Sequence, residues 1–398
     1  MAKIHMLYPF TFILFLFFST SALAAAYYVQ ASGGNDANPG DGWGTGHALA
    51  TVGAAMAKAA VSPGADTIHV AAGTYRERVA MVSAVTLLGG YPSAGGTSRN
   101  PTANDTILDG QEGGTVVEMI SADNVTLDGF TITNGSRADG CGGGVLAVNG
   151  TGVVIKNNRI IGNTYSGTEG GGGAGICIDS TIGSDIRENT ISTNISAFDG
   201  GGIFAYYSSS ALIHENVITG NTAINWGGGL NIYHSSATAY NNVIMGNIAT
   251  GHGGGISVYD SGNLTAANIT MTGNISLNTT GGGGYIESST VSLRNFIIWD
   301  NSPDQVVSST GAALTVTYSD VQGGFAGTGN IALDPRFAFD PEGMPLLTAN
   351  SPCIDSGTAT GAPNTDIRGM ARPWGRAYDM GAYEMSLYQP QLPLLLLQ

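Results

Sequence analysis

The chain has 398 residues, of which 61 are glycine, 14 are Lys or Arg and 29 are Asp or Glu, and 42% are hydrophobic. This hydrophobic share supports a large buried core, which argues against a disordered chain. Glycine shows no period of three and the charged residues no heptad pattern, which excludes a collagen helix and a long coiled coil. The net charge of -15 argues against a nucleic-acid partner, because a phosphate backbone selects basic surfaces.

The N-terminal segment has the organisation of a secretory signal peptide. Lys3 supplies a positive charge, residues 7–18 form an apolar run, and Ala22, Leu23 and Ala24 fit a small-x-small cleavage site. The apolar run is too short to serve as a membrane-spanning anchor. We therefore assign residues 1–24 to a signal peptide and expect a secreted or surface-displayed protein.

The next predicted elements are one helix and several short strands. Residues 49–60 have a helical composition, and strands are predicted at 67–70, 85–89 and 125–129. If the strands stack into a solenoid, their unpaired edges must be covered. We expect the helix to be the N-terminal cap.

An internal repeat dominates residues 142–301. Glycine triplets begin at Gly142, Gly200, Gly227 and Gly253. Each repeat closes on an asparagine, and the closing asparagines are Asn163, Asn194, Asn221, Asn247, Asn274 and Asn301, with spacings of 31, 27, 26, 27 and 27. Propeller blades need about 40 residues, and the leucine frame of a leucine-rich repeat is missing. Residues 203–206 and 230–233 alternate at period two, which predicts an all-β parallel β-helix with three short strands per coil.

Equivalent residues of successive coils should form columns about 4.8 Å apart. The closing asparagines then make a ladder of hydrogen bonds along the axis. A second predicted ladder contains Asn158, Asn189, Asn216 and Asn242.

The repeat fades after Asn301, and from Asp334 the composition shifts towards Pro, Asp and Arg. We place a β-helix with its N-terminal cap at residues 25–333 and a C-terminal cap or anchor-type domain at residues 334–398. The acids and arginines of this domain (Asp355, Asp366, Arg368, Arg372, Asp379 and Glu384) are expected to hold a loop-rich unit together.

Three sets of residues carry a resemblance to known families. The repeat, with residues 27–29, 33–36 and 72–75, resembles secreted bacterial right-handed β-helix proteins of the pectin-lyase-like superfamily. The segments 334–337, 351–357 and 379–384 are similar to the choice-of-anchor Q domain of surface-sorted proteins. The glycine triplets are reminiscent of polymorphic outer-membrane adhesin repeats. The resemblance implies fold and export, whereas the superfamily contains lyases, hydrolases, esterases and inert adhesins.

Two columns form a candidate groove. The outward strand positions of consecutive coils are Asp179, Tyr206, Tyr233 and Tyr259, and the turns before these strands contribute Asp139, Glu169, Asp199, Trp226 and His252. Aromatic rings suit the apolar faces of sugars, and carboxylates suit hydroxyls or calcium. We therefore predict polysaccharide binding, with possible calcium at Asp139, Glu169 and Asp199. The alternative is a tyrosine ladder that only stabilises stacked strands, with solvated turns.

Catalysis in this groove has few candidate residues. Between Asp179 and Asn301 there is no lysine, and the only arginines are Arg187 and Arg294, which fall in a different column. A lyase would need His252 or a tyrosine as its base, and an inverting hydrolase would need the pair Glu169 and Asp199.

A compact charged patch (Arg187, Glu188, His214 and Glu215) is predicted on another strand. We interpret it as a surface ion-pair network rather than an active site.

The predicted register separates Cys141 from Cys177 by five residues, or about 16 Å. A disulfide needs Cα atoms within about 7 Å, so these residues are predicted not to pair.

The sequence thus favours an exported, monomeric β-helix with an adhesin or scaffold role, which binds extracellular polysaccharide. A polysaccharide lyase or glycoside hydrolase in the same groove is the alternative, and a purely structural surface component is a third possibility.

Overall fold

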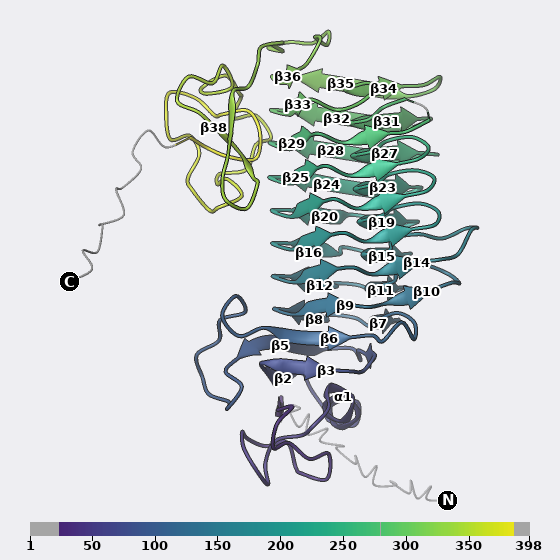
Figure 1. Ribbon diagram of the computed structural model, residues 1–398, viewed down its shortest axis with the longest axis vertical. Helices are drawn as coiled ribbons and strands as arrows, with labels where there is room; N and C mark the ends of the chain where they lie inside the picture. Colours follow the sequence, from purple (N-terminus) through teal and green to yellow (C-terminus); the bar gives the residue numbers. More distant parts are fainter. Residues whose placement is uncertain (1–23, 279, 386–398) are drawn as a thin grey trace, which may run out of the picture.

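The computed structural model describes residues 24–278 and 280–385, which form an all-β, right-handed parallel β-helix with a smaller region beside it (Figure 1). The predicted fold class is confirmed. The strands of the solenoid form four parallel sheets, which we call A, B, C and D and whose strands are given below. Each central coil passes through them in the order C, A, B, D. A coil therefore has a fourth strand, of two residues, besides the three expected. The predicted signal peptide falls outside the described residues, except for Ala24.

Sheets A and B are the longest of the four sheets. Sheet A contains β1 (Ala26–Val29), β2 (Asp66–Ala71), β5 (Val85–Tyr91), β8 (Thr126–Asp128), β12 (Val154–Lys156), β16 (Asp185–Arg187), β20 (Ala211–His214), β24 (Ser236–Tyr240), β28 (Asn263–Ala267), β32 (Thr290–Arg294) and β35 (Ala313–Thr317). Sheet B contains β3 (Gly73–Tyr75), β6 (Thr106–Asp109), β9 (Thr131–Thr133), β13 (Arg159–Ile161), β17 (Thr190–Ser192), β21 (Val217–Thr219), β25 (Val243–Met245), β29 (Thr270–Thr272), β33 (Ile297–Trp299) and β36 (Asp320–Val321).

Sheets C and D complete the coils. Sheet C contains β4 (Val79–Ala80), β7 (Val117–Ile120), β11 (Val145–Val148), β15 (Ile176–Asp179), β19 (Ile203–Tyr206), β23 (Leu230–Tyr233), β27 (Ile256–Tyr259), β31 (Gly284–Glu287) and β34 (Val306–Ser308). Sheet D contains β10 (Ser136–Arg137), β14 (Thr164–Tyr165), β18 (Ile195–Ser196), β22 (Thr222–Ala223), β26 (Ile248–Ala249) and β30 (Ile275–Ser276). All pairs within these sheets for which a register is known are parallel; the antiparallel hairpin of β37 (Phe337–Phe339) and β38 (Pro345–Leu347) lies in the side region.

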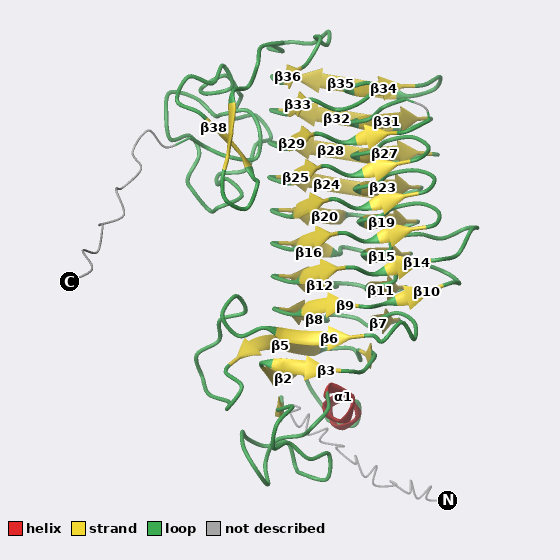
Figure 2. Ribbon diagram, in the orientation of Figure 1, coloured by secondary structure: helices red, strands yellow, loops and turns green. Residues whose placement is uncertain are grey.

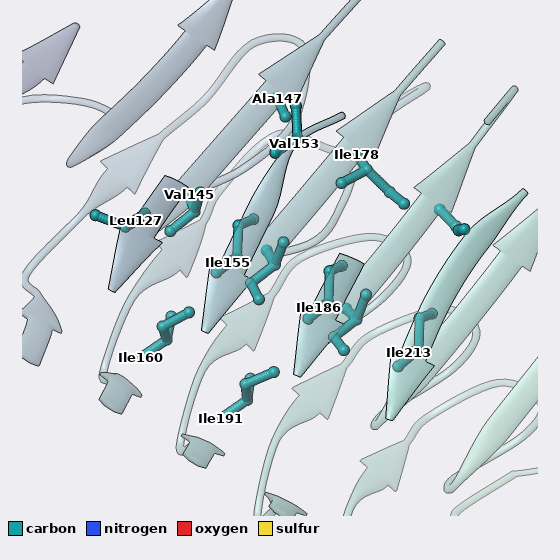
Figure 3. Close-up of a cluster of buried hydrophobic side chains, with 14 of the residues drawn as sticks. Leu127, Val145, Ala147, Val153, Ile155, Ile160, Ile178, Ile186, Ile191 and Ile213 are labelled. Atoms are coloured by element: carbon teal, nitrogen blue, oxygen red, sulfur yellow. The ribbon is translucent and has the colours of Figure 1, made fainter. Parts of the chain in front are cut away.

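The core of the solenoid is a set of aliphatic columns that run along its axis (Figure 3). Ile155, Ile186 and Ile213 come from consecutive strands of sheet A and are fully buried. They face Ile160 and Ile191 of sheet B, which are equally buried. Burial of each such side chain contributes about 2 to 3 kcal/mol, so the repeat is stabilised coil by coil.

Both predicted asparagine ladders are present. The backbone N–H of Asn194 donates to Oδ1 of Asn221 at 3.1 Å, and the Asn194 Nδ2 donates to the same oxygen and to the Ile160 carbonyl, each at 2.9 Å. The second ladder repeats this arrangement from Asn189 to Asn216. The ladders therefore satisfy the backbone groups of the buried corners.

The glycine triplets allow the turn before each sheet C strand to fold back over that strand. Gly200 has a φ of +57°, and a Cβ at this position would lie 2.7 Å from the Cβ of Phe204. A larger residue would therefore be strained by both its backbone angle and this contact. The consequence is that the turn residues cover part of the outer face of sheet C.

This folded-back turn overturns the cysteine prediction, because Cys141 and Cys177 form a disulfide with their Cα atoms 5.9 Å apart. The predicted strand register itself is correct, since Cys177 lies opposite Leu146. The error was to treat residues 141–145 as extended: Gly142 has a φ of +80°, so the chain returns over Leu146 and brings Cys141 above Cys177. Cys353 is free and buried.

At the N-terminal end, helix α1 (Val52–Ala59) lies within the predicted 49–60 segment and is the only helix in the described part of the chain (Figure 2). Its side chains Val52, Ala55, Met56 and Ala59 join the main core cluster. Thr51 caps the helix by accepting a hydrogen bond from the Ala54 N–H.

The region beyond the last solenoid strand differs from the expected C-terminal cap. Residues 322–331 fold over the end of the solenoid, where Phe325 packs on the core and the Val321 N–H donates to the Ile331 carbonyl. Residues 334–385, which we call the flank region, lie beside the upper coils instead (Figure 1). The flank region covers Val243 and Ile297 on the outer face of sheet B.

Three corner asparagines attach the flank region to the solenoid. Asn241 and Asn268 donate to the carbonyls of Thr365 and Asp379, and Asn295 donates to Thr358. Within the flank region, buried Arg372 and Glu384 form an ion pair at 2.8 Å, and Asp366 and Asp379 accept hydrogen bonds from the backbone. The predicted structural role of the acids and arginines is thereby confirmed.

Candidate functional site

The outer face of sheet C carries two parallel columns of side chains. The outer column is Val148, Asp179, Tyr206, Tyr233, Tyr259 and Glu287. The register predicted for Asp179 and the three tyrosines is therefore confirmed. The inner column is Leu146, Cys177, Phe204, Asn231, Ser257 and Tyr285, and it is buried beneath the folded-back turns.

A pocket of about 270 Å³ opens between these columns and the turns, and we call it the aromatic pocket. It is lined by Gly170, Phe198, Asp199, Phe204, Tyr206, Asn225, Trp226, Tyr233 and Tyr259. Five of the predicted groove residues thus lie around one cavity: Asp199, Tyr206, Trp226, Tyr233 and Tyr259. The lining is dominated by aromatic rings with few polar groups, which is the usual composition of a small-molecule site.

Asp199 is the only ionisable acid of the aromatic pocket and is 2% exposed. Its Oδ2 accepts from the Tyr259 hydroxyl at 2.5 Å, while its Oδ1 accepts from Asn225 Nδ2 at 2.8 Å and from the Trp226 N–H at 3.1 Å. Burial raises the pKa of Asp199 to about 6, against the opposing effect of these hydrogen bonds. The carboxyl therefore orients two aromatic residues and titrates near neutral pH.

Trp226 lines the aromatic pocket and contacts two further rings. Its ring lies 4.2 Å from the Tyr259 ring and 5.4 Å from the His252 ring, both in edge-to-face arrangements. His252 in turn stacks on Tyr285 at 4.1 Å. Burial lowers the pKa of His252, which favours its neutral form at physiological pH.

The tyrosines of the outer column also contact one another. Tyr206 and Tyr233 stack with centroids 5.3 Å apart and an interplanar angle of 14°, whereas Tyr233 and Tyr259 are tilted by 52°. The ladder interpretation is thus correct for Tyr206 and Tyr233, whose facing surfaces cover each other. Both side chains line the aromatic pocket, while their hydroxyls interact with Tyr207 and, for Tyr233, also with Asp260.

The other predicted turn acids lie apart from the aromatic pocket. Asp139 is exposed beside Arg137, and Glu169 is exposed and absent from the pocket lining. Among residues 24–278 and 280–385, no group of three His, Cys, Asp or Glu side chains is arranged to hold a metal ion. The structure therefore does not gather Asp139, Glu169 and Asp199 into one carboxylate cluster, and calcium stays a prediction.

The charged patch lies on sheet A, away from the aromatic pocket. Arg187 pairs with Asp185 at 2.9 Å and with Glu188 at 3.2 Å, and His214 bridges Asp185 and Glu215. The predicted ion-pair network is confirmed, with Asp185 as an additional member. The Arg187 and His214 partners hold the pKa of Asp185 below its usual value despite burial.

A larger cavity of about 640 Å³ lies over sheet B, between the 99–105 segment and Glu342 of the flank region. Its charged side chains already have partners in part: Arg99 binds Asp128 at 2.5 Å, and Glu188 binds Arg187. It has one aromatic lining residue, Phe130. The aromatic pocket is therefore the better candidate despite its smaller volume.

Sequence reasoning missed two sets of residues. Phe204 and Asn225 line the pocket because the turns fold back, and this path has no direct sequence signal. Tyr207, His234 and Asp260 follow the three tyrosines directly and form a further column in the next turn. The recurring Tyr-x-Ser pattern at 206–208, 233–235 and 259–261 was the available signal.

Comparisons with known proteins agree with this fold. Residues 95–244 match the family described as the right handed beta helix region. A pectate lyase, Pel9A, superposes with a TM-score of 0.50 at 16% identity and covers 91% of this chain and 96% of its own. The structure of XylC with xylose has a TM-score of 0.43 at 11% identity, with 90% and 98% coverage. A pectin methylesterase from Aspergillus niger has a TM-score of 0.34 at 14% identity, with 79% and 88% coverage.

At such identities, the likeness to Pel9A shows the fold alone. The search of curated proteins finds no significant match. Within the described residues, no helix has the length and apolar character that crossing a bilayer requires.

Proposed function

We propose that this protein binds extracellular polysaccharide through the aromatic pocket, in an adhesin or scaffold role. The observation that supports the proposal is one cavity that combines Tyr206, Trp226, Tyr233 and Tyr259 with a single buried carboxyl, Asp199. Aromatic rings offer apolar surfaces to the C–H faces of a sugar, and Asp199 and Asn225 are the polar, non-aromatic side chains that the lining places beside them.

The size of the pocket limits what enters it. Its volume of about 270 Å³ lies just below the range of about 300 to 1,000 Å³ that holds drug-sized ligands. One sugar ring suits this volume, and the rest of a chain would lie outside, along sheet C. Asp179 belongs to the coil beside Tyr206 and extends the polar surface there.

Cleavage of the bound polysaccharide is the second candidate function, and Asp199 is the observation that favours it. A carboxyl with a pKa of about 6 remains partly protonated near neutral pH and suits a general acid. The pocket lining contains no second carboxyl, because Glu169 lies outside it, so an inverting hydrolase would require another base. A lyase would draw its base from His252 or a tyrosine.

Export and surface attachment belong to the same proposal. They rest on the signal-peptide pattern at residues 1–24 and on the resemblance of segments in the flank region to choice-of-anchor domains. Fractionation of cells that express the whole chain tests them: the mature protein is expected in the envelope or medium.

Glycan-array binding of the mature protein, with and without calcium, tests the main proposal. Trp226→Ala should weaken binding at least about fivefold, because it removes an aromatic ring from the lining of the pocket. Arg187→Ala, on sheet A, should bind as the wild type does. Absence of binding to any glycan would instead favour a purely structural protein.

Two product assays distinguish binding from cleavage. Unsaturated chain ends detected by ultraviolet absorbance would identify a lyase, and new reducing ends without such absorbance would identify a hydrolase. If either product disappears in Asp199→Asn, Asp199 takes part in the reaction; binding without product supports the adhesin or scaffold role.

A further inference from the structure

We propose that Tyr207, supported by His234 and Asp260, is a second aromatic platform that takes the next sugar ring of a polysaccharide chain held in the aromatic pocket. The inference rests on the proposed function. It concerns the turn that follows each sheet C strand. This turn lies at the C-terminal end of the strand, whereas Asp199 and Trp226 lie in the turns before the N-terminal ends of β19 and β23.

The backbone of this turn is the same in six coils. The first residue after the strand has a φ between 46° and 55° in every case: Asn149, Ser180, Tyr207, His234, Asp260 and Ser288. Short polar residues such as Asn, Asp and Ser tolerate this left-handed conformation, whereas bulky side chains are rare in it. Five coils carry a short polar residue or a histidine, which is also enriched in this conformation, and only Tyr207 has a bulky side chain of the disfavoured kind.

Tyr207 stacks on His234 despite its disfavoured backbone conformation. Their rings stack with centroids 4.9 Å apart and an interplanar angle of 7°, and His234 Nε2 contacts Asp260 Oδ2 at 3.1 Å. His234 thus lies between a ring and a carboxylate from the two neighbouring coils. This support fixes the plane of the Tyr207 ring.

The Tyr207 side chain is nevertheless 50% exposed. One ring face lies on His234, and Tyr206 meets Tyr207 edge-to-face at 4.6 Å. No other ring contact of Tyr207 besides these and the edge-to-face contact with Tyr233 occurs in the described residues. An exposed, immobilised aromatic ring in a disfavoured backbone conformation is typical of a binding position, because stability alone would select a short polar residue.

The platform adjoins the aromatic pocket directly. Tyr206 lines the pocket and contacts Tyr207, so the two sites share this residue. Asp179, at the same strand position as Tyr206 but one coil away along the axis, supplies a carboxylate for sugar hydroxyls. A sugar ring in the pocket and the following ring on Tyr207 would therefore belong to one chain.

Chain length is the variable that tests the platform. Affinity electrophoresis in gels containing xylan, galactomannan, β-glucan or polygalacturonate measures polymer binding, and calorimetry with the corresponding monosaccharides measures the pocket alone. Tyr207→Asn, which copies Asn149 of the same turn, should weaken polymer binding about three- to tenfold and leave monosaccharide binding unchanged. Tyr207→Phe keeps the ring and should bind polymer like the wild type.

Two control variants separate the possible failures. Trp226→Ala should lose both polymer and monosaccharide binding, and Trp374→Ala removes an exposed ring of the flank region and should lose neither. If Trp226→Ala loses binding while Tyr207→Asn keeps full polymer affinity, the platform is wrong and the proposed function survives. If no polysaccharide retards the wild type, both are wrong.

A stability measurement tests the strain without any ligand. Tyr207→Asn and Tyr207→Ala remove the same ring stacking, but only asparagine suits the left-handed backbone. Tyr207→Asn should therefore unfold at a higher urea concentration than Tyr207→Ala. Equal midpoints would remove the argument that Tyr207 is kept at the expense of stability.

Discussion

The corner between sheets B and D and the outer face of sheet C are built by the same repeat, yet they differ in how strictly it is kept. From Asn163 to Asn301, six successive coils have asparagine at the corner, and each side chain serves its neighbour. Over the same coils the outer column of sheet C changes from valine to an acid, then to three tyrosines and back to an acid. A buried asparagine that bonds to the next asparagine needs the same partner in every coil, whereas a half-buried column without such bonds is free to specialise.

The largest effect is expected from breaking a corner ladder. Asn221 is fully buried and joins Asn194 on one side to Asn247 on the other. Asn221→Ala leaves the Asn194 N–H and the Ile191 carbonyl without their partner, which should lower the free energy of unfolding by about 3 kcal/mol or more. Urea unfolding measures this loss. The exposed Asn350→Ala is the control and should change it by less than about 0.5 kcal/mol.

The disulfide between Cys141 and Cys177 should have the next largest effect. It closes a loop with a sequence separation of 36, for which the chain-entropy estimate is about 3 to 4 kcal/mol. Replacing both cysteines by alanine should lower the free energy of unfolding by an amount of that order. Thiol titration of the denatured, unreduced protein should find one thiol, Cys353; three thiols would show that the turn does not fold back as described.

A third prediction concerns pH and the pocket carboxyl. The pKa of Asp199 is about 6 in the folded protein, compared with about 4 in an unfolded chain. Between these values the folded state binds the proton more tightly, so the contribution of Asp199 to stability is largest at low pH and falls as the pH rises from about 4 to about 6. The fall should be on the order of 2 kcal/mol.

Comparison with Asp199→Asn isolates this contribution, because other acids such as Asp379, whose pKa is also raised to about 6, are common to both proteins. Urea unfolding at several pH values between 4 and 7 should show the wild type losing stability relative to the variant as the pH rises. A constant difference, or one that grows in favour of the wild type, would contradict the buried position of the carboxyl.

Regularity explains which parts of this molecule could be predicted from its sequence. The coils, both ladders and the register of Asp179, Tyr206, Tyr233 and Tyr259 all follow from a period that must satisfy buried hydrogen bonds and columns. The ion-pair network on sheet A was also predicted, because its members occupy neighbouring registers.

The parts that could not be predicted depend on backbone angles and on contacts outside the repeat. Gly142 reverses the chain over Leu146, and a count of residues along extended strands missed the resulting disulfide. The left-handed turn at Tyr207 is equally invisible in a pattern of hydrophobicity. The flank region docks on Asn241, Asn268 and Asn295. Asn157 occupies the equivalent position of an earlier coil but binds Asp128 instead, so an asparagine at this position does not by itself predict where the flank region lies.

The smallest effect is expected on sheet A, where another variable column tests whether variation by itself marks a binding site. Arg187 pairs with Asp185 and Glu188, but all three side chains remain between 26% and 41% exposed. Partly exposed pairs contribute about 0 to 1 kcal/mol each, because solvent screens the charges and the side chains lose freedom on pairing. Arg187→Ala should therefore lower the free energy of unfolding by less than about 1 kcal/mol, and added salt should reduce the difference further. In polysaccharide-containing gels, Arg187→Ala should be retarded as much as the wild type, whereas Trp226→Ala should be retarded less than the wild type.

If Arg187→Ala lost affinity, the specialised surface of the solenoid would be sheet A, and the fold-back of the glycine turns over sheet C would have a structural role only.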